Sequence, residues 1–373
     1  MELLLPCVII FMSLFNHASC SQYDKPYSAI FSFGDSYADT GNFITVMKEK
    51  IAYDVFEHSP YGMTYFGQPT GRGSNGRLVI DFIAQDLGLP LLPPYFSQGQ
   101  DFSKGANFAV IGAPALSIDY LRQQGISNFY PVDISLNVQL GWFQQLKPSL
   151  CNSTESCQDY FSKSLFVLGE IGGNDYNFVI SSGKSISDAI SFVPVVMDTI
   201  KAAAESLLKQ GALHIVLPGN LPTGCIPILL TIFASTNKLD YDHLGCLTAY
   251  NSIGFYHNLK LKELVAQLQD SYPQAKIMYA DYYEPVIKFL ENPDNFGFSN
   301  DNQLVICCGG GGPYNFNFSA NCGQPGGSAC SDPSIRINWD GIHLTEAAFR
   351  VIATGWLKGP YAHPPILPGN KRK

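Results

Sequence analysis

The chain has 373 residues, of which 46% are hydrophobic and 14% are charged, and its formal net charge at pH 7 is −8. This composition supplies enough apolar side chains for a sizeable core and excludes a largely disordered chain. The acidic balance, with no basic stripe, argues against a nucleic-acid partner. The basic residues at 371–373 are most simply a solvated end.

Residues 1–20 have the pattern of a secretory signal peptide. A mostly apolar run over 3–14 precedes a small-residue site at 18–20 that resembles a cleavage site. The run is short for a membrane helix, and no later stretch is long enough. We therefore expect a single domain over 21–373 that enters the secretory pathway without stable membrane insertion. An extracellular or cell-wall location is expected first, with vacuole or Golgi as alternatives.

A short apolar and partly aromatic run over residues 29–33 predicts a buried strand. Gly34 follows and permits a sharp turn, because glycine has no Cβ. Ser36 then lies at the end of that turn, a position that suits a nucleophile with backbone N–H groups nearby. The same serine could instead cap a helix. Taken alone, this stretch leaves both interpretations open.

A long connection rich in Gly, Pro, Tyr and Phe occupies residues 40–76, and such loops in compact domains are usually functional. Its aromatic residues could form a wall for a substrate or pack beneath the loop, and packing is slightly favoured. Residues 78–87 follow with helical spacing, and Gly88 ends that helix. For Arg77 we expect a structural role, such as an ion pair, rather than a catalytic one.

Apolar runs and helical patterns alternate along the rest of the chain. Such alternation predicts a parallel sheet covered on both faces, so we expect an α/β fold. In detail it would be a three-layer α/β/α sandwich with a central parallel sheet of about five strands. Active residues should lie at the carboxyl ends of the strands. The later strands are expected at 107–113, 165–169, 213–219 and 276–281, and the later helices at 134–146, 187–209, 244–268, 283–291 and 346–357.

A carboxylate and an imidazole lie three residues apart near the C-terminus, as Asp340 and His343. A serine nucleophile needs a base, and the base needs a carboxylate that orients it. A turn would bring Asp340 and His343 together. A lone histidine is usually structural, but this pair, combined with Ser36 near the mature start, favours a serine-based catalytic site.

Eight of the ten cysteines lie beyond the expected signal peptide. An oxidising compartment would allow up to four disulfides among them. Local spacing suggests that Cys151 pairs with Cys157 and that Cys225 pairs with Cys246. The other four are expected to pair among themselves, in a connectivity that the sequence leaves open: Cys307, Cys308, Cys322 and Cys330. A metal site is the weaker alternative, because the cysteines lack C-x-x-C spacing and matching histidines.

Two sequons, at Asn152 and Asn317, are plausible N-glycosylation sites in loop-like segments that carry cysteines. Other catalytic signatures are missing from the sequence: it contains no G-x-S-x-G, P-loop or H-E-x-x-H motif. The glycine run at 309–312 follows two cysteines and precedes no Lys-Ser or Lys-Thr pair, so it indicates a tightly turned or flexible loop.

Four blocks occur in order along the chain: Gly-Asp-Ser at 34–36, Gly-Ser-Asn-Gly-Arg at 73–77, Gly-Gly-Asn-Asp-Tyr at 172–176 and Asp-Gly-Ile-His at 340–343. Together they resemble the plant GDSL-type esterases/lipases of the SGNH hydrolase superfamily, across essentially the whole mature chain. The resemblance implies a flavodoxin-like fold. Tyr37 stands where the family's name expects leucine. That position is not catalytic in the family, so the departure bears only on local packing.

The resemblance also implies roles for individual residues. Ser36 would be the nucleophile, His343 its base, and Asp340 the carboxylate that orients the base. The oxyanion hole would comprise the N–H groups of Ser36 and Gly76 together with the side chain of Asn174. For Asn174, an Asx-turn is the structural alternative.

Within the second block, Gly76 is the better match for the oxyanion donor and Gly73 is the fallback. A plain turn before a helix is the alternative for both glycines. Neither a cofactor nor a metal is expected for this chemistry.

The resulting hypothesis is a secreted serine carboxylic ester hydrolase acting on a small-molecule or polysaccharide ester. Lipid acyl chains, acetyl groups on cell-wall polysaccharide and esters of specialised metabolites all fit. One alternative is an acyltransferase that uses the same triad with an alcohol acceptor. The other is a non-catalytic protein that keeps the fold and binds a glycan or another partner.

Overall fold

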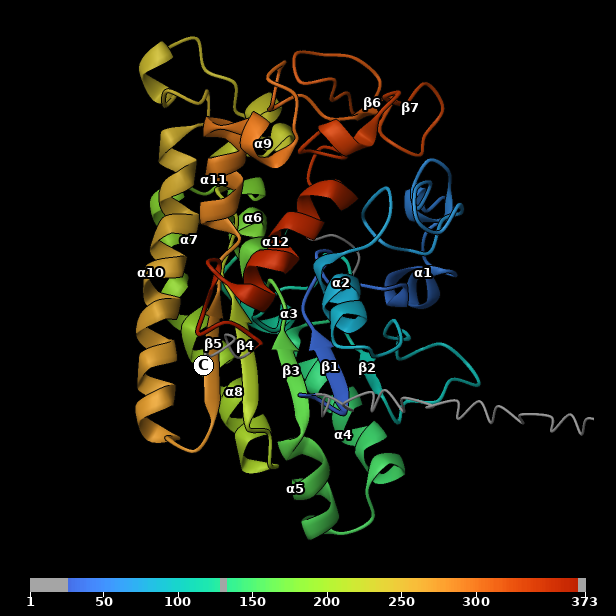
Figure 1. Ribbon diagram of the computed structural model, residues 1–373. Coiled ribbons are helices and arrows are strands. Elements are labelled where there is room, and N and C mark those ends of the chain that lie inside the picture. The colour runs from blue at the N-terminus through green and yellow to red at the C-terminus, as the bar shows by residue number, and fades with distance from the viewer. Residues whose placement is uncertain (1–25, 128–132, 368–373) are drawn as a thin grey trace, which may run out of the picture.

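Five parallel strands form the centre of the molecule, and a short antiparallel strand extends one edge (Figure 1). The computed structural model describes residues 26–127 and 133–367, so the expected signal peptide and the basic end lie outside the described residues. The order across the sheet is β2-β1-β3-β4-β5-β8. These strands are β1 (Ala29–Phe33), β2 (Gly105–Asn107), β3 (Ser164–Leu168), β4 (His214–Pro218), β5 (Lys276–Ala280) and β8 (Ala362–His363).

Successive residues of each strand enter two separate cores, because side chains alternate between the faces of a sheet. In β1, Phe31 and Phe33 belong to one core and Ile30 to the other. The same division holds in β3, where Phe166 lies in the first core and Leu165 in the second. A strand buried on both faces needs apolar residues at every position, which explains the continuous apolar runs in the sequence.

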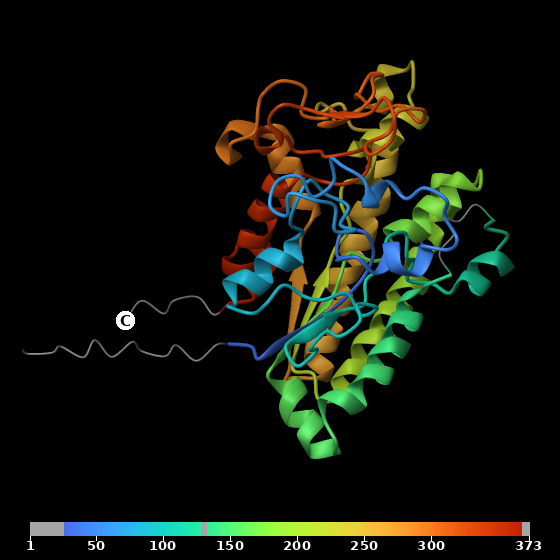
Figure 2. The same cartoon turned by 90° about the vertical axis from the view of Figure 1, so that its right-hand side faces the viewer.

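Helices cover both faces of the sheet, so the fold has three layers (Figure 2). One layer contains α2, α11 and α12, and the opposite layer contains α4, α8 and α10. The helices are α1 (Asn42–Met47), α2 (Val79–Asp86), α3 (Ile118–Gln123), α4 (Leu136–Leu150), α5 (Thr154–Ser162), α6 (Gly173–Ser181), α7 (Ile186–Ser191), α8 (Val193–Lys209), α9 (Pro227–Ile232), α10 (Thr248–Ser271), α11 (Tyr283–Glu291) and α12 (Glu346–Lys358).

The expected three-layer architecture is confirmed, with differences at three elements. The second strand ends at Asn107 rather than continuing to Ala113. Beyond it the polar backbone groups are used elsewhere: the Asn107 side chain accepts from the N–H of Ala109, and Asn42 donates to the carbonyls of Asn107 and Ala109. The chain therefore leaves the regular ladder, although the N–H of Phe108 still reaches β1.

The helix expected over 187–209 is two helices, α7 and α8, which meet at Phe192. Pro194 stands in the first turn of α8, and proline has no N–H with which to continue a helix from the preceding turn. The antiparallel edge strand β8 was not predicted. It has only two residues, too few to produce an alternating pattern.

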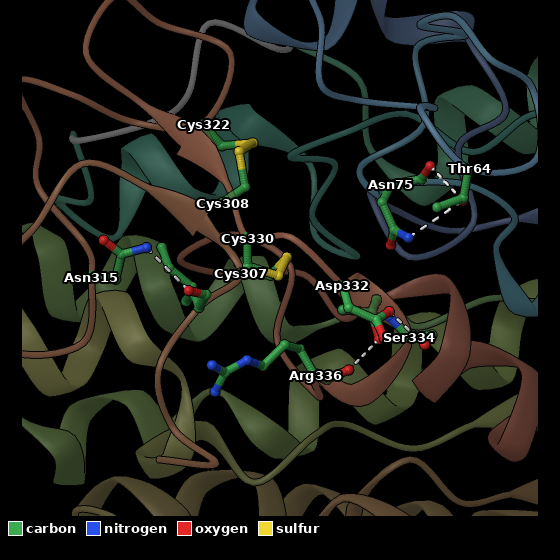
Figure 3. Close-up of a disulfide and its surroundings, with 12 residues drawn as sticks. Thr64, Asn75, Cys307, Cys308, Asn315, Cys322, Cys330, Asp332, Ser334 and Arg336 are labelled. Atoms are coloured by element: carbon green, nitrogen blue, oxygen red, sulfur yellow. Dashed lines mark hydrogen bonds between the residues drawn. A yellow bond between two sulfur atoms is a disulfide. The ribbon is translucent and has the colours of Figure 1, made fainter. Parts of the chain in front are cut away.

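Four disulfides join the eight cysteines beyond the expected signal peptide. The predicted Cys151–Cys157 and Cys225–Cys246 bridges are both present. The last four cysteines pair among themselves in a nested arrangement, with Cys308–Cys322 inside Cys307–Cys330 (Figure 3). The two bridges staple the loop that contains the short hairpin of β6 (Cys308–Gly309) and β7 (Ser328–Ala329).

Asn152 and Asn317 of the two sequons are both exposed. None of the helices in the described part of the chain combines the length and the hydrophobicity that a membrane crossing requires.

Candidate active site

The turn that carries Ser36 is fixed at the carboxyl end of β1. Gly34 has φ +128, and a Cβ there would lie 2.9 Å from Gly169 Cα, so a side chain would be both strained and blocked. The side chain of Gln139 on α4 accepts from the Gly34 N–H and donates to its carbonyl, each at 2.8 Å. Ser36 does not cap α1, whose N-cap residue is Gly41.

Asp340 and His343 form the expected carboxylate–imidazole pair. His343 Nδ1 lies 2.8 Å from Asp340 Oδ2, while Asp340 Oδ1 accepts the backbone N–H groups of Ile342 and His343 at 2.8 and 2.7 Å. The Tyr61 hydroxyl donates to Asp340 Oδ2 at 2.7 Å. Burial alone would raise the pKa of Asp340, but the charge of His343 and these hydrogen bonds outweigh it and hold the pKa below its usual range. Asp340 is therefore an ionised partner for the imidazole.

The imidazole of His343 is enclosed by groups that fix its plane. Phe56 meets it edge-on with ring centroids 5.9 Å apart, and a Cβ on Gly73 would lie 3.1 Å from three atoms of the ring. Tyr37, the departure from the family pattern, lies 5.7 Å from the imidazole and donates its hydroxyl to the Ile342 carbonyl at 2.7 Å. Tyrosine at this position thus ties the nucleophile turn to the histidine loop.

Ser36 and His343 line one cavity with a volume of about 750 Å³. Ser36 is 6% exposed and His343 3% exposed, so both belong to the floor of this cavity. His343 Nε2 is buried without a hydrogen-bond partner among the described residues, and this nitrogen is the one available to take a proton. The walls of the cavity are mostly apolar: Phe56, Ile111, Phe178, Ile180, Ile226, Ile228, Leu229, Ile232, Phe233 and Ile342.

Asn174 also lines this cavity, from the first turn of α6. Its carboxamide nitrogen donates to Asp35 Oδ2 at 2.8 Å and to the carbonyl of Ala113 at 3.1 Å. These long-range bonds replace the local bond of an Asx-turn and hold the carboxamide beside the nucleophile turn.

Of the two glycines considered in the second block, neither is brought to the wall of the Ser36 cavity. The N–H of Gly76 faces Ser74 Oγ at 3.4 Å, and its Cα lies against the side chains of Glu346 and Thr64. Gly73 covers the face of the His343 ring. Gly112 does line the cavity, where it follows β2 at the same sheet edge as Ser36. Sequence reasoning missed this glycine, although its position after a strand beside β1 was a usable signal.

A pair of buried carboxyl groups lies directly behind the nucleophile. Asp35 and Glu170 are 2% and 3% exposed, and their side chains hydrogen-bond each other. Burial raises the pKa of Glu170 well above its usual range, and the adjacent Asp35 raises it further. Folding therefore favours the protonated form of Glu170. Asp35 in turn accepts a hydrogen bond from the Asn174 carboxamide, so the buried pair also helps to position Asn174.

Tyr65 and Phe66 of the loop over 40–76 pack against arginine side chains, the role that the sequence slightly favours. The guanidinium of Arg77 lies 4.0 Å from the ring centroid of Tyr65, and the Arg77–Glu346 ion pair is 2.6 Å long. Phe66 packs in the same way against Arg72. Tyr61, in contrast, donates its hydroxyl to Asp340. Arg77 is thus structural, as expected.

Within residues 26–127 and 133–367, no group of three His, Cys, Asp or Glu side chains is arranged to hold a metal ion.

The three-layer fold, with Ser36 and His343 lining one cavity at the carboxyl ends of the strands, is typical of a class of α/β hydrolytic enzymes. Comparison with known proteins makes this specific, because the family model described as GDSL-like Lipase/Acylhydrolase matches residues 30–356. The chain belongs to this family.

Similar relatives are GDSL esterases/lipases of Arabidopsis thaliana. One is 43% identical over 362 residues, covering 96% of this chain and 91% of its own length. A second is 44% identical over 345 residues, covering 91% and 92%. A third is 46% identical over 344 residues, covering 92% and 85%. Membership of a family of lipases and acylhydrolases supports carboxylic ester hydrolase activity for this chain.

Proposed function

We propose that this protein is a secreted serine esterase in which Ser36, His343 and Asp340 form the catalytic triad. The observation that carries the proposal is the cavity floor, where Ser36 lies with a histidine already oriented by a buried, ionised Asp340. A merely binding protein would have no need for this pair beside an accessible serine.

In the acylation step, His343 Nε2 takes the proton of the Ser36 hydroxyl as Ser36 Oγ attacks the ester carbonyl carbon. The carbonyl oxygen becomes an oxyanion in a tetrahedral intermediate. Collapse of this intermediate breaks the bond to the alcohol oxygen, which receives the proton from His343 and leaves. Water then attacks the acyl-serine by the same route and releases the acid.

Hydrogen-bond donors around Ser36 would stabilise the oxyanion. We propose the backbone N–H groups of Ser36 and Gly112 together with one N–H of the Asn174 carboxamide, because all three residues line the cavity. Asn174 would exchange its 3.1 Å bond to the Ala113 carbonyl for a bond to the oxyanion and keep the shorter bond to Asp35. Gly112 has φ +78, which lets the backbone turn there, and its lack of a side chain leaves room for a bound carbonyl. Gly76 is not included, since it faces Glu346 and Thr64 instead.

The acyl group is proposed to be longer than acetyl. A cavity of about 750 Å³ with mainly aliphatic and aromatic walls would be largely unfilled by two carbons. Each buried methylene is worth about 0.8 kcal/mol, so binding of the transition state should improve along a series of longer chains. The expected preference is for medium or long acyl chains, or for an acyl group with an aromatic ring.

Four disulfides are consistent with a protein of the secretory pathway, because such bridges persist in oxidising compartments. An extracellular or cell-wall location is the proposal, with glycans on the exposed Asn152 and Asn317. Digestion of the secreted protein with an N-glycosidase should lower its mass, and single Asn→Gln variants would assign each site.

The decisive experiment is labelling of the purified protein with a fluorophosphonate, followed by hydrolysis of p-nitrophenyl esters from acetate to decanoate. We expect label on the wild type, no label on Ser36→Ala or His343→Ala, and kcat/KM that rises with chain length. Absence of label on folded wild type would overturn the proposal. Acyl transfer to an added alcohol that outcompetes hydrolysis would replace it with an acyltransferase.

A further inference from the structure

His343 lies between two cavities rather than at the edge of one. The second cavity has a volume of about 320 Å³ and shares His343, Phe56, Ile228 and Ile342 with the first. Its lining includes Asp340 and not Ser36, so it adjoins the first cavity at the residues that the two share and continues past the imidazole.

The proposed reaction indicates which part of the ester would occupy the second cavity. The carbonyl carbon must lie at Ser36, and the oxyanion donors and the large apolar walls belong to the first cavity. The leaving oxygen must lie within hydrogen-bond reach of the histidine that protonates it. An alcohol that leaves toward His343 therefore extends into the second cavity.

Two loops far apart in the sequence meet to form its walls. One loop supplies the rings of Tyr53, Phe56 and Tyr61, and the other supplies Phe316. The Tyr53 hydroxyl donates to the carbonyl of Gly323, which joins the loops. The ring of Tyr53 is held parallel to that of His58 with centroids 4.2 Å apart, and it is still 45% exposed.

Two carboxamides complete the lining, from Asn321 and Gln324. Asn321 Oδ1 is buried and has no hydrogen-bond partner in the described part of the chain, so it lacks the donor that a buried acceptor requires. The Cys308–Cys322 disulfide (Figure 3) fixes the backbone next to Asn321, because Cys322 follows Asn321 in the chain. A Cβ on Gly323 would lie 2.8 Å from the Val55 carbonyl, which shows how closely the two loops pack.

We infer that this second cavity binds the alcohol part of the ester, and that the alcohol is a neutral polyhydroxylated ring such as a sugar. Aromatic rings can pack against the apolar face of such a ring, while the carboxamides of Asn321 and Gln324 bond its hydroxyl groups. An anionic alcohol fits less well, because Asp340 lines the cavity and no Lys or Arg among the described residues does so. The inference rests on the proposed ester hydrolysis.

The kinetic test compares two esters with the same acyl group, 6-O-hexanoyl-glucose and ethyl hexanoate. Since a site built to bond hydroxyl groups rejects analogues that lack them, the wild type should hydrolyse the glucose ester with kcat/KM at least about tenfold higher. Asn321→Leu should reduce that ratio about tenfold, mainly through KM, and Gln324→Leu should reduce it by a smaller factor. Gln303→Leu, in the same region but outside the lining, should leave the ratio as in the wild type.

A binding measurement separates this inference from the proposed function. Calorimetric titration of Ser36→Ala with 6-O-hexanoyl-glucose should show binding that the added Asn321→Leu substitution weakens about tenfold. If such binding occurs but the wild type hydrolyses no ester, the proposed function fails and the cavity assignment stands. If both esters are hydrolysed with equal kcat/KM and neither carboxamide variant changes the ratio, the alcohol assignment fails alone. A higher kcat/KM for hexanoylcholine than for the glucose ester would also overturn it.

Discussion

Ser36 and His343 reach one cavity from regions of the molecule that are held together in different ways. The Ser36 turn continues a central strand, and Gln139, Asn174 and the buried Asp35–Glu170 pair fix it from within the fold. The His343 loop follows no strand of the central sheet. The N–H groups of Cys307 and Cys308 hold it through the carbonyls of Asn338 and Trp339, at 2.9 and 2.7 Å.

The difference suggests a division of labour. The position of Ser36 follows from the central sheet, whose two faces contribute to the two cores. The position of His343 depends on loops that are held by disulfides and by single hydrogen bonds from the side chains of Tyr37 and Tyr61. Changes on the histidine side should therefore alter turnover before they alter the fold, and changes behind Ser36 should alter both.

The largest expected effect is on turnover and comes from Asp340→Asn. The substitution removes the charge that orients His343 and stabilises the imidazolium, so kcat should fall by about 10⁴-fold, as expected for loss of a triad carboxylate. Unfolding in urea should change little, because an asparagine oxygen can still accept the two backbone N–H groups. The control is Asp332→Asn, an exposed residue of the same segment. A loss of kcat under tenfold would remove Asp340 from the triad.

The next effect compares two disulfides. Conversion of Cys307 and Cys330 to serine should lower the free energy of unfolding by about 3 kcal/mol. It should also lower kcat, because the N–H of Cys307 bonds the carbonyl of Asn338 in the loop that carries Asp340. The matched control removes Cys151–Cys157, which closes a loop of six residues at the other end of the sheet. That control should lose stability and keep kcat. Equal kcat in both variants would show that the staple serves stability only.

A smaller effect concerns the pH dependence of stability. The pKa of Glu170 is raised on folding, so its contribution is full below its ordinary pKa of 4.5 and is lost as pH rises through the folded value. The unfolding free energy should therefore decline from pH 5 to pH 8. Glu170→Gln keeps a hydrogen bond to Asp35 without the second ionisation, so it should flatten this decline by about 1 to 2 kcal/mol.

Chemical denaturation at pH 5, 6, 7 and 8 measures this change. Glu205→Gln, on the outer part of α8, is the control because its carboxylate is paired with the exposed Lys209. If the Glu170 variant retains the full slope of the wild type, a raised pKa of Glu170 is not the source of the decline.

Much of the fold could be predicted because the sheet is buried on both faces. Runs such as 165–168 and 277–280 contain no charged position that would obscure a strand, and the helices between them favour a parallel order. The exceptions are informative. β2 is shortened by side-chain bonds from Asn42 and Asn107, which depend on tertiary contacts that local patterns do not contain.

The residues of the candidate site also fall into two groups, those with a local sequence motif and those whose position depends on tertiary contacts. Ser36, Asp340 and His343 were proposed from short motifs, since each motif places its chemistry within a few residues. Gly112 was missed because its role depends on which strand lies beside β1. Glu170 and Tyr61 carry no local signal at all: Tyr61 bonds a residue 279 positions away in the sequence.

Tyr61→Phe has the smallest expected effect on kcat, and it tests a single hydrogen bond of the loop that carries His343 and Asp340. It removes one hydrogen bond to Asp340 Oδ2 and keeps the ring that packs against Phe56 and Trp339. Because His343 and two backbone N–H groups still bond the carboxylate, kcat should fall only about three- to tenfold, in line with loss of about 1 kcal/mol. Tyr65→Phe, whose hydroxyl accepts from Gln85 at the exposed surface, should leave kcat unchanged. A loss as large as that of Asp340→Asn would mean that the loop over 40–76, rather than the backbone around Asp340, sets the position of the catalytic pair.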